Sequence, residues 1–382
     1  MFALRRPGEP AVAEIGGIRV HHLPVGRHQG AGIGTYLREY IAFLIRSAIA
    51  LARAHRRRRF GLVDVNSLPD FLVLAGLPLR LVGVPLLLDL HEAMPEFFVS
   101  RFPRAANPLA RVALAVQERL SITAASAVMT VNESLAGRLR ANGLAPDKLT
   151  VVLNSPSLHL FDPAAHIRRS FMEDGRLRLV YAGALTPIYE LDVCLRAVAD
   201  LRRTRPELDV QLELYGRGDS EPDLRRLADE LAIADRVRFG GRIALEAVPA
   251  AVAAADIGLA PTRRDAFTER SLSTKLFEYA AMGKPVIASD LPTVRHYFPD
   301  GTIRRYDSGD AAGLAAAIAN LVDRPDERAA AIAATVVALE PLGWDHQAAT
   351  YLGLVDRLAS GDRLSSRSGR PDGSDGRSAE DV

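Results

Sequence analysis

The sequence predicts an α/β protein made of two Rossmann-like, doubly wound domains that face each other across a cleft. Three observations lead to this prediction. The chain has 382 residues, of which 48% are apolar and 25% charged, which is typical of a globular protein with two domains. Short apolar runs alternate with helical patterns, which indicates βαβ units around parallel sheets. The alternation stops once, at residues 154–163, and then restarts. A ligand is therefore expected between the domains, at the carboxyl ends of the strands.

The first domain is expected over residues 1–160. Four apolar runs have the length of buried parallel strands; they are Leu62–Asn66, Val84–Leu90, Ala127–Val131 and Leu149–Leu153. Apolar spacings of three and four predict helices at Tyr36–Leu51, Leu68–Val82, Pro108–Ala124 and Glu133–Asn142. Phe2–Leu4 is at most the end of a strand, and Ile15–Leu23 has the pattern of a hairpin-like edge. Since such domains normally open with a buried strand, we expect an incomplete N-terminal domain whose first strand is missing.

The second domain is expected over residues 161–342, after a linker rich in proline and serine. Its strands are predicted at Leu177–Ala182, Val210–Tyr215, Val237–Gly240, Asp256–Ala260 and Pro285–Ala288. Its helices are predicted at Leu191–Arg203, Glu221–Ala232, Ala247–Ala254, Thr274–Met282, Ala311–Leu321 and Pro325–Leu339. A closing helix is expected within residues 343–360. Residues 361–382 contain too little apolar surface to offset the entropy of ordering, so we expect a disordered tail there.

Charge and cysteine content exclude several classes of protein. There are 48 Lys and Arg against 46 Asp and Glu, a net charge of +2, which argues against a dedicated nucleic-acid binder. Cys194 is the only cysteine, so no internal disulfide can form. The longest apolar stretch, Phe71–Leu90, is interrupted by prolines and charges and is interpreted as core rather than a membrane span. Neither an Asp-x-Asp pair nor a histidine cluster is present, so we expect no metal.

The helix predicted at Thr274–Met282 begins with residues that suit a phosphate. Ser271, Ser273 and Thr274 are natural N-cap residues, and free N–H groups and the dipole at a helix start favour an anion. Lys275 lies in the first turn, where a diphosphate could dock. Glu278 lies one turn further along, and its carboxylate suits a ribose diol. The residue types alone leave open a plain amphipathic helix with both charges in solvent.

Other candidate site residues follow predicted strands. Gly183, Gly216 and Gly218 permit close approach of a ligand, although each also fits an ordinary tight turn. His91 ends a buried strand and could hydrogen-bond a sugar hydroxyl or move a proton. Gly30–Gly34 does not have the spacing of a dinucleotide-binding loop and is interpreted as a flexible loop.

Lys275-Leu-Phe-Glu278-Tyr-Ala-Ala-Met-Gly283-Lys-Pro285-Val-Ile resembles the donor-site signature of the family 4 glycosyltransferases, which have the GT-B fold. The stretches at 181–186, 215–218, 241–243 and 255–261 are similar to that family too, as is 88–95 around His91. The resemblance implies a nucleotide-sugar donor with Glu278 on the ribose, and catalytic roles for His91 and Glu269. The implied donor-binding residues are Gly183, Gly216, Arg217, Arg242, Ile243, Ser271, Leu272, Ser273, Thr274, Lys275 and Glu278.

The chain departs from the family pattern at three places. The first acid of the usual pair falls on Arg270, and Glu269 is one position away. The basic residue expected after the first glycine turn is absent from Thr186–Glu190, which leaves more of the diphosphate binding to Lys275. The family also opens with a strand and glycine loop that contact the acceptor, and we expect this chain to start after them. From this we expect a truncated gene model or an N-terminal loss.

We therefore expect a hexosyltransferase-type glycosyltransferase that moves a sugar from a nucleotide-sugar to an unknown acceptor, without a metal or a cofactor. The resemblance implies retention at the anomeric carbon and a role in surface polysaccharide or glycolipid assembly at the cytoplasmic side. A glycan or lipid-linked acceptor is expected. Arg53–Arg59 could contact an anionic membrane or form a solvated helix end. The alternatives are a nucleotide-sugar-binding protein without transfer activity and a sugar-nucleotide epimerase.

Overall fold

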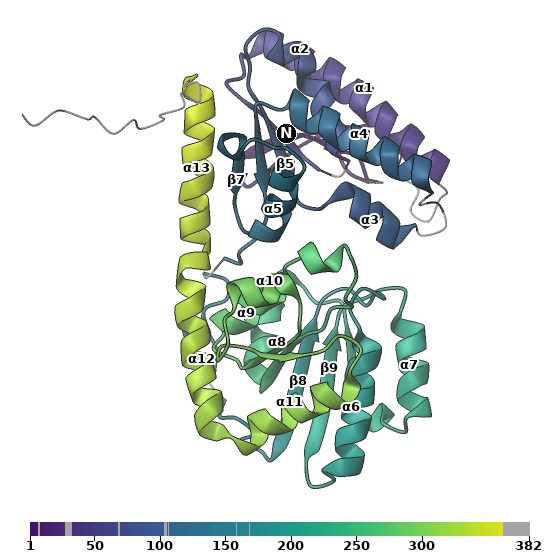
Figure 1. The fold of residues 1–382 in the computed structure, drawn as a ribbon, viewed down its shortest axis with the longest axis vertical. Coiled ribbons are helices and arrows are strands. Elements are labelled where there is room, and N and C mark those ends of the chain that lie inside the picture. The colour runs from purple at the N-terminus through teal and green to yellow at the C-terminus, as the bar shows by residue number, and fades with distance from the viewer. Residues whose placement is uncertain are drawn as a thin grey trace, which may run out of the picture.

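The computed structural model describes residues 1–6, 8–26, 33–67, 69–102, 105, 107–157, 159–167 and 169–361. Residues 30–32 of the expected glycine loop, and the expected tail from residue 362 on, lie outside the described residues. Two α/β domains lie one above the other, and a pair of helices runs along one side of both (Figure 1). The predicted fold class of two Rossmann-like domains is confirmed. In the described part of the chain no helix is both long and apolar enough to span a bilayer.

The N-terminal domain contains a four-stranded parallel sheet. Its strands, in spatial order, are β4 (Val63–Asn66), β5 (Leu86–Leu90), β6 (Ala127–Thr130) and β7 (Leu149–Val151). All residues of β5 and β6 are buried, as expected of central strands that are covered on both faces. The four strands that the sequence predicts therefore form this sheet.

A separate three-stranded sheet lies at the N-terminus. It has the order β1 (Phe2–Leu4), β3 (Ile18–Leu23), β2 (Val12–Ile15), with β1 parallel to β3. The strands β2 and β3 form an antiparallel hairpin through Gly16 and Gly17, whose φ values of 56° and 77° suit a tight two-residue turn. Two expectations are thus corrected: the hairpin begins at Val12 rather than Ile15, and Phe2–Leu4 is a paired strand.

The helices of this domain are α1 (Ile33–Arg57), α2 (Leu77–Arg80), α3 (Met94–Arg101), α4 (Pro108–Ala124) and α5 (Glu133–Ala141). The helix predicted at Leu68–Val82 is wrong as one element, because a 3-10 helix η1 (Asp70–Gly76) precedes the short α2. Pro78 lacks the N–H that a continuous helix would need. Asn107 and Asn132 cap α4 and α5 by accepting from backbone N–H groups at 2.8 and 2.9 Å.

The C-terminal domain contains a six-stranded parallel sheet. In spatial order its strands are β10 (Val237–Gly241), β9 (Asp209–Tyr215), β8 (Arg176–Ala182), β11 (Ile257–Ala260), β12 (Val286–Ser289) and β13 (Arg304–Tyr306). Its helices are α6 (Leu191–Thr204), α7 (Glu221–Glu230), α8 (Val248–Ala254), α9 (Thr274–Ala281), α10 (Pro292–Tyr297), α11 (Ala311–Asp323) and α12 (Pro325–Leu339). Sequence periodicity missed α10 and β13, which are too short to show a period.

The last helix, α13 (Trp344–Ser360), returns to the N-terminal domain. Leu354 packs in one apolar cluster with Leu87 of β5 and Met129 of β6. Gln347 accepts a hydrogen bond at 2.9 Å from the backbone N–H of Leu153, just after β7. Since α12 packs against α9 and α13 against the N-terminal sheet, this pair of helices ties the two domains together beside the cleft.

Candidate functional site

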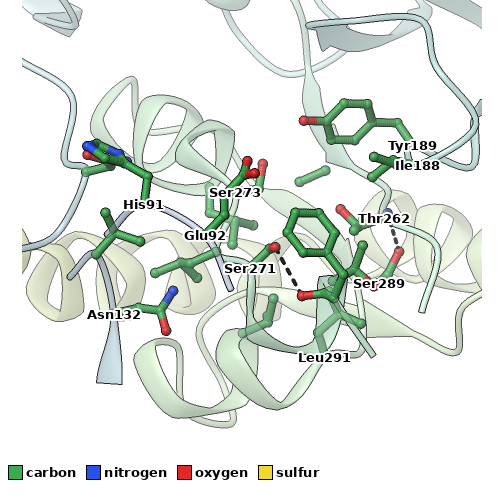
Figure 2. Close-up of a pocket in the computed structure, with 18 of the residues that line it drawn as sticks. His91, Glu92, Asn132, Ile188, Tyr189, Thr262, Ser271, Ser273, Ser289 and Leu291 are labelled. Carbon is green, nitrogen blue, oxygen red and sulfur yellow. Dashed lines mark hydrogen bonds between the residues drawn. The ribbon is translucent and has the colours of Figure 1, made fainter. Parts of the chain in front are cut away.

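A cavity of about 290 Å³ lies between the two domains. Its N-terminal wall is formed by residues that follow β5 and β6, by α3 and by the linker; they are His91, Glu92, Phe97, Val131, Asn132 and Asn154. Its C-terminal wall includes residues that follow β8 and β11, the end of β12 and the loop before α9; among them are Ile188, Tyr189, Thr262, Ser271, Ser273 and Ser289 (Figure 2). The cavity thus lies at the carboxyl ends of both parallel sheets, where a ligand was predicted.

The start of α9 lines the C-terminal wall. Ser271, Leu272 and Ser273 all line the cavity, and Ser273 is the N-cap residue. Its side chain makes no capping hydrogen bond, so the first N–H groups of α9 keep no such partner. The carbonyl of Ser271 accepts a hydrogen bond at 2.7 Å from Thr293 Oγ1, which fixes the loop. A helix start in this position favours an anion.

Lys275 is held beside this helix start by aromatic rings. It is only 7% exposed, and its Nζ lies 4.3 Å from the ring centre of Tyr189 and 5.1 Å from that of Tyr181. Burial lowers its pKa from 10.5 to about 8, while the charge of Glu278 acts in the opposite direction. Among the described residues its Nζ forms neither an ion pair nor a hydrogen bond. The ammonium group is therefore a desolvated charge held by two rings, directly behind the cavity wall at Tyr189.

The glycines that follow β8 and β9 are required by the packing of protein atoms against them. A Cβ at Gly183 would lie 2.4 Å from Cε of Lys275, and a Cβ at Gly216 would lie 1.7 Å from the carbonyl oxygen of Gly183. Gly216 also has a φ of 148°. Neither glycine lines the cavity. Protein atoms fill the space that each glycine leaves, as expected for the tight turns that the sequence also allowed. Gly183 matters to the site because a side chain there would displace Lys275.

His91 lines the N-terminal wall of the cavity, directly after β5. Its Nε2 lies 2.8 Å from Oδ2 of the buried Asp89, and Nδ2 of Asn154 lies 3.4 Å from its Nδ1. The hydrogen bond to Asp89 raises the pKa of His91 above its usual value, against the effect of burial. Burial likewise raises the pKa of the neighbouring Glu92. An imidazole oriented by a carboxylate, with its other nitrogen toward the cavity wall, can hold a hydroxyl group or carry a proton.

Several predicted site residues do not line the cavity. Glu269 lies on the 3-10 helix η6 (Thr268–Arg270) and its carboxylate accepts from Arg264 Nε at 2.7 Å. Arg217 and Arg242 are exposed at the ends of β9 and β10, next to Ile243. Thr274 and Glu278 lie on α9; burial raises the pKa of Glu278, and Lys275 opposes that rise. The structure thus brings His91, Ser271, Leu272 and Ser273 to one cavity, with Lys275 packed behind Tyr189.

Sequence reasoning missed Tyr189 and the buried Glu190 next to it. The carboxylate of Glu190 is fully buried and accepts from Ser289 Oγ, Tyr306 Oη and the backbone N–H of Gly309 at 2.8 to 2.9 Å. Ser289 Oγ in turn accepts from the N–H of Thr262 at 2.7 Å, a bond drawn in Figure 2. This network fixes the ends of β11 and β12. Its only sequence signal was the departure at Thr186–Glu190, where the expected basic residue is absent.

The two domains make direct polar contacts beside the cavity. Asn132 Nδ2 donates to the carbonyl of Arg270 at 2.8 Å, and Ser100 Oγ donates to Asp265 Oδ2 at 2.9 Å. Phe97 of α3 packs edge-on against Phe267 at a ring distance of 5.5 Å. These contacts with the N-terminal domain therefore hold the loop before α9 in place. Within the described ranges no group of three His, Cys, Asp or Glu side chains is arranged to hold a metal.

Comparison with known proteins gives matches to both halves of the chain. Residues 176–324 match the family described as glycosyl transferases group 1, and residues 1–155 match the glycosyl transferase 4-like domain. A D-inositol 3-phosphate glycosyltransferase of Stackebrandtia nassauensis is 30% identical over 386 residues, which cover 95% of this chain and 81% of that protein. One from Thermomonospora curvata is 28% identical over 293 residues, which cover 72% of this chain and 65% of that protein.

Solved structures share the fold at lower identity. Sucrose-phosphate synthase from Thermosynechococcus elongatus has a TM-score of 0.75 at 20% identity, over 94% of this chain and 89% of that one. HepE from Anabaena, solved in complex with UDP-glucose, has a TM-score of 0.62 at 17% identity over 82% of each chain. Two Rossmann-like domains with a cavity at their facing strand ends define the GT-B fold. The chain belongs to the family 4 glycosyltransferases, as the resemblance around Lys275 and Glu278 implied.

Proposed function

We propose that this glycosyltransferase takes its sugar from a nucleotide-sugar and binds the diphosphate of that donor at the start of α9. The observation that carries the proposal is the ammonium group of Lys275. It is buried and stacked on two tyrosine rings, one of which, Tyr189, lines the interdomain cavity, and among the described residues it has no carboxylate within ion-pair distance. HepE, which shares the fold, was solved with UDP-glucose, and this supports the same class of donor.

The proposed donor site uses charge and backbone donors instead of a metal. The N–H groups at Ser271–Thr274 and the Lys275 ammonium meet the diphosphate, which is electrostatic stabilisation of the leaving nucleotide. Glu278 holds the ribose, and Arg217, Arg242 and Ile243 are outer donor contacts. We propose no cofactor, with the nucleotide-sugar as cosubstrate. The polar contacts between the domains would keep water out of the closed site and so limit hydrolysis of the donor.

The sugar is proposed to lie beside His91 in the cavity, with Glu269, which does not line the cavity, as its contact from the C-terminal domain. His91, oriented by Asp89, holds a hydroxyl or carries a proton, and Glu269 would approach from the loop before α9. Retention at the anomeric carbon, a hexosyl group as the sugar, and a glycan or lipid-linked acceptor complete the proposal. They fit a role in surface polysaccharide or glycolipid assembly at the cytoplasmic side of a membrane, with the exposed Arg56–Arg59 facing anionic lipid.

Calorimetric titration with UDP-glucose tests the donor site. We expect Lys275→Met to weaken binding at least about tenfold, because the diphosphate of the donor loses its nearest cation. Lys284→Met is the matched control, since Lys284 is a half-buried lysine of the same domain that binds the carbonyls of Ala253 and Ala255. Equal affinity in Lys275→Met and the wild type would overturn the site assignment.

Product analysis separates transfer from the alternatives. Glycosylated product that forms only when an acceptor is added supports transfer. A changed sugar formed from the donor alone would indicate an epimerase. Tight donor binding without turnover in a broad acceptor screen would indicate a binding protein.

A further inference from the structure

The helix α1 carries an exposed apolar stripe. Leu37, Ile41, Ile45 and Ile49 recur every four residues, and their side chains are 43% to 54% exposed. Residues four apart lie on one face of a helix. Leu51 and Ala52 instead pack toward the core of the N-terminal domain. The stripe is therefore the outer face of α1, and a large apolar surface on a folded chain marks a contact site.

A second stripe runs along α4. Leu109, Val112, Val116 and Leu120 follow one another at three or four residues and are 52% to 78% exposed. The inner face of the same helix is buried at Glu118, Ser121 and Ala124. As on α1, these exposed apolar residues have the spacing of a stripe that faces a protein core, although no described element covers them.

The two stripes belong to one side of the molecule. Both α1 and α4 pack on η1, which also contacts α2. Figure 1 shows α1, α2 and α4 gathered on the side of the N-terminal domain away from α13. The turn after α2 adds Leu81 and Val82, which are 88% and 65% exposed. We call the exposed apolar side chains of α1, α2, α4 and this turn the apolar face.

The charges around the apolar face are predominantly positive. The helices α1, α2 and α4 contain eight arginines against two glutamates, Glu39 and Glu118. Glu118 is buried and paired with Arg138 at 2.7 Å, so it adds no negative charge to the surface. Arg56–Arg59 are all exposed at the end of α1. A surface that is both apolar and basic complements an anionic lipid leaflet.

We propose that the apolar face docks the N-terminal domain on an anionic lipid bilayer, with its apolar side chains at the acyl boundary and its arginines among the phosphates. The same charge argues against a second copy as the occupant, because two basic faces would repel each other. The arrangement lies on the membrane and does not cross it. It deepens the acceptor side of the proposed function by naming the surface that would bring a lipid-linked acceptor within reach.

Vesicle co-sedimentation of the full chain, without donor, tests the docking separately from transfer. The probes are vesicles of phosphatidylcholine alone and of phosphatidylcholine with about one third phosphatidylglycerol. We expect binding to the anionic vesicles, weakened by salt, and a loss of about tenfold or more in Ile45→Glu/Val116→Glu. The matched control is Val336→Glu/Val337→Glu on α12, which adds the same charges at valines 48% and 69% exposed and should bind as the wild type.

Three measurements keep the outcome decisive. Thermal unfolding and UDP-glucose affinity of Ile45→Glu/Val116→Glu should equal those of the wild type, which separates lost docking from lost folding or a failed donor site. Equal vesicle binding by the two double variants would overturn the proposal. So would light scattering that shows a dimer broken by Ile45→Glu/Val116→Glu, because the face would then be an interface between copies.

Discussion

The lowered pKa of Lys275 predicts that donor affinity depends on pH in a defined direction. In the protein without donor, burial lowers the pKa of Lys275 from 10.5 to about 8. A diphosphate binds the charged ammonium, so its binding raises this pKa and takes up a proton wherever the free protein has lost it. Affinity should be constant below pH 8. Above pH 8 it should fall by up to about tenfold per pH unit until the pKa of the complex is reached.

The same shift has a consequence for stability. A lysine with a lower pKa in the folded than in the unfolded chain disfavours folding while it must be charged. The penalty is fully present below pH 8 and is relieved as the pH rises from about 8 to 10.5. The difference of roughly 2.5 pKa units corresponds to about 3 kcal/mol as an upper limit. The unliganded protein therefore gives up stability to keep a cation at the site.

Calorimetry with UDP-glucose at pH 7, 8 and 9, in two buffers of different ionisation enthalpy, measures both affinity and proton uptake. We expect uptake approaching one proton at pH 9 and little at pH 7. Lys275→Met should remove the uptake, and Lys284→Met should keep it. A wild-type affinity that is flat from pH 7 to 9, or an equal slope in Lys275→Met, would refute the reasoning.

Three further predictions concern single groups. Gly183→Ala should weaken UDP-glucose binding about tenfold by displacing Lys275, whereas Gly137→Ala, where a Cβ meets nothing within 4 Å, should leave it unchanged; unaltered binding in Gly183→Ala would contradict the packing argument. Asp89→Asn should lower the pKa of His91 in an NMR titration, and an unmoved His91 pKa would count against the pair. In the wild type, the pair stabilises the fold below the pKa that His91 has in the unfolded chain, and this stability should be lost as the pH rises through the higher pKa of the folded protein. Glu190→Ala should cost about 3 kcal/mol or more in urea unfolding, because several buried donors lose their acceptor; a cost below about 1 kcal/mol would show that the network contributes little.

The sequence predicted most of the fold because the strands of both sheets are short, apolar and separated by periodic helices. The prediction failed where a single proline interrupted a helical pattern, and where an element was too short for its pattern to be visible. Pro78 divided the helix expected at Leu68–Val82, and Gly76 admits Leu86, whose Cδ2 would lie 2.6 Å from a Cβ there. The short β13 and α10 carry too few residues for a period to be visible.

The candidate site was predicted in part. The start of α9 and His91 were found because N-cap residues and strand ends are local features. Tyr189 and Glu190 were not found, since their roles depend on partners far along the chain. Tyr189 stacks on Lys275, and Glu190 accepts hydrogen bonds from Ser289 and Tyr306. The glycines were located correctly, but only the packing of Lys275 on Gly183 explains why a side chain is excluded there.

The most direct measurement is a crystal structure of the full chain with UDP-glucose bound. We expect the diphosphate oxygens within hydrogen-bond distance of Lys275 Nζ and of the N–H groups that open α9, with the sugar toward His91. Clear density for the nucleotide elsewhere, with Lys275 still stacked on Tyr189 and no anion at the helix start, would contradict the account.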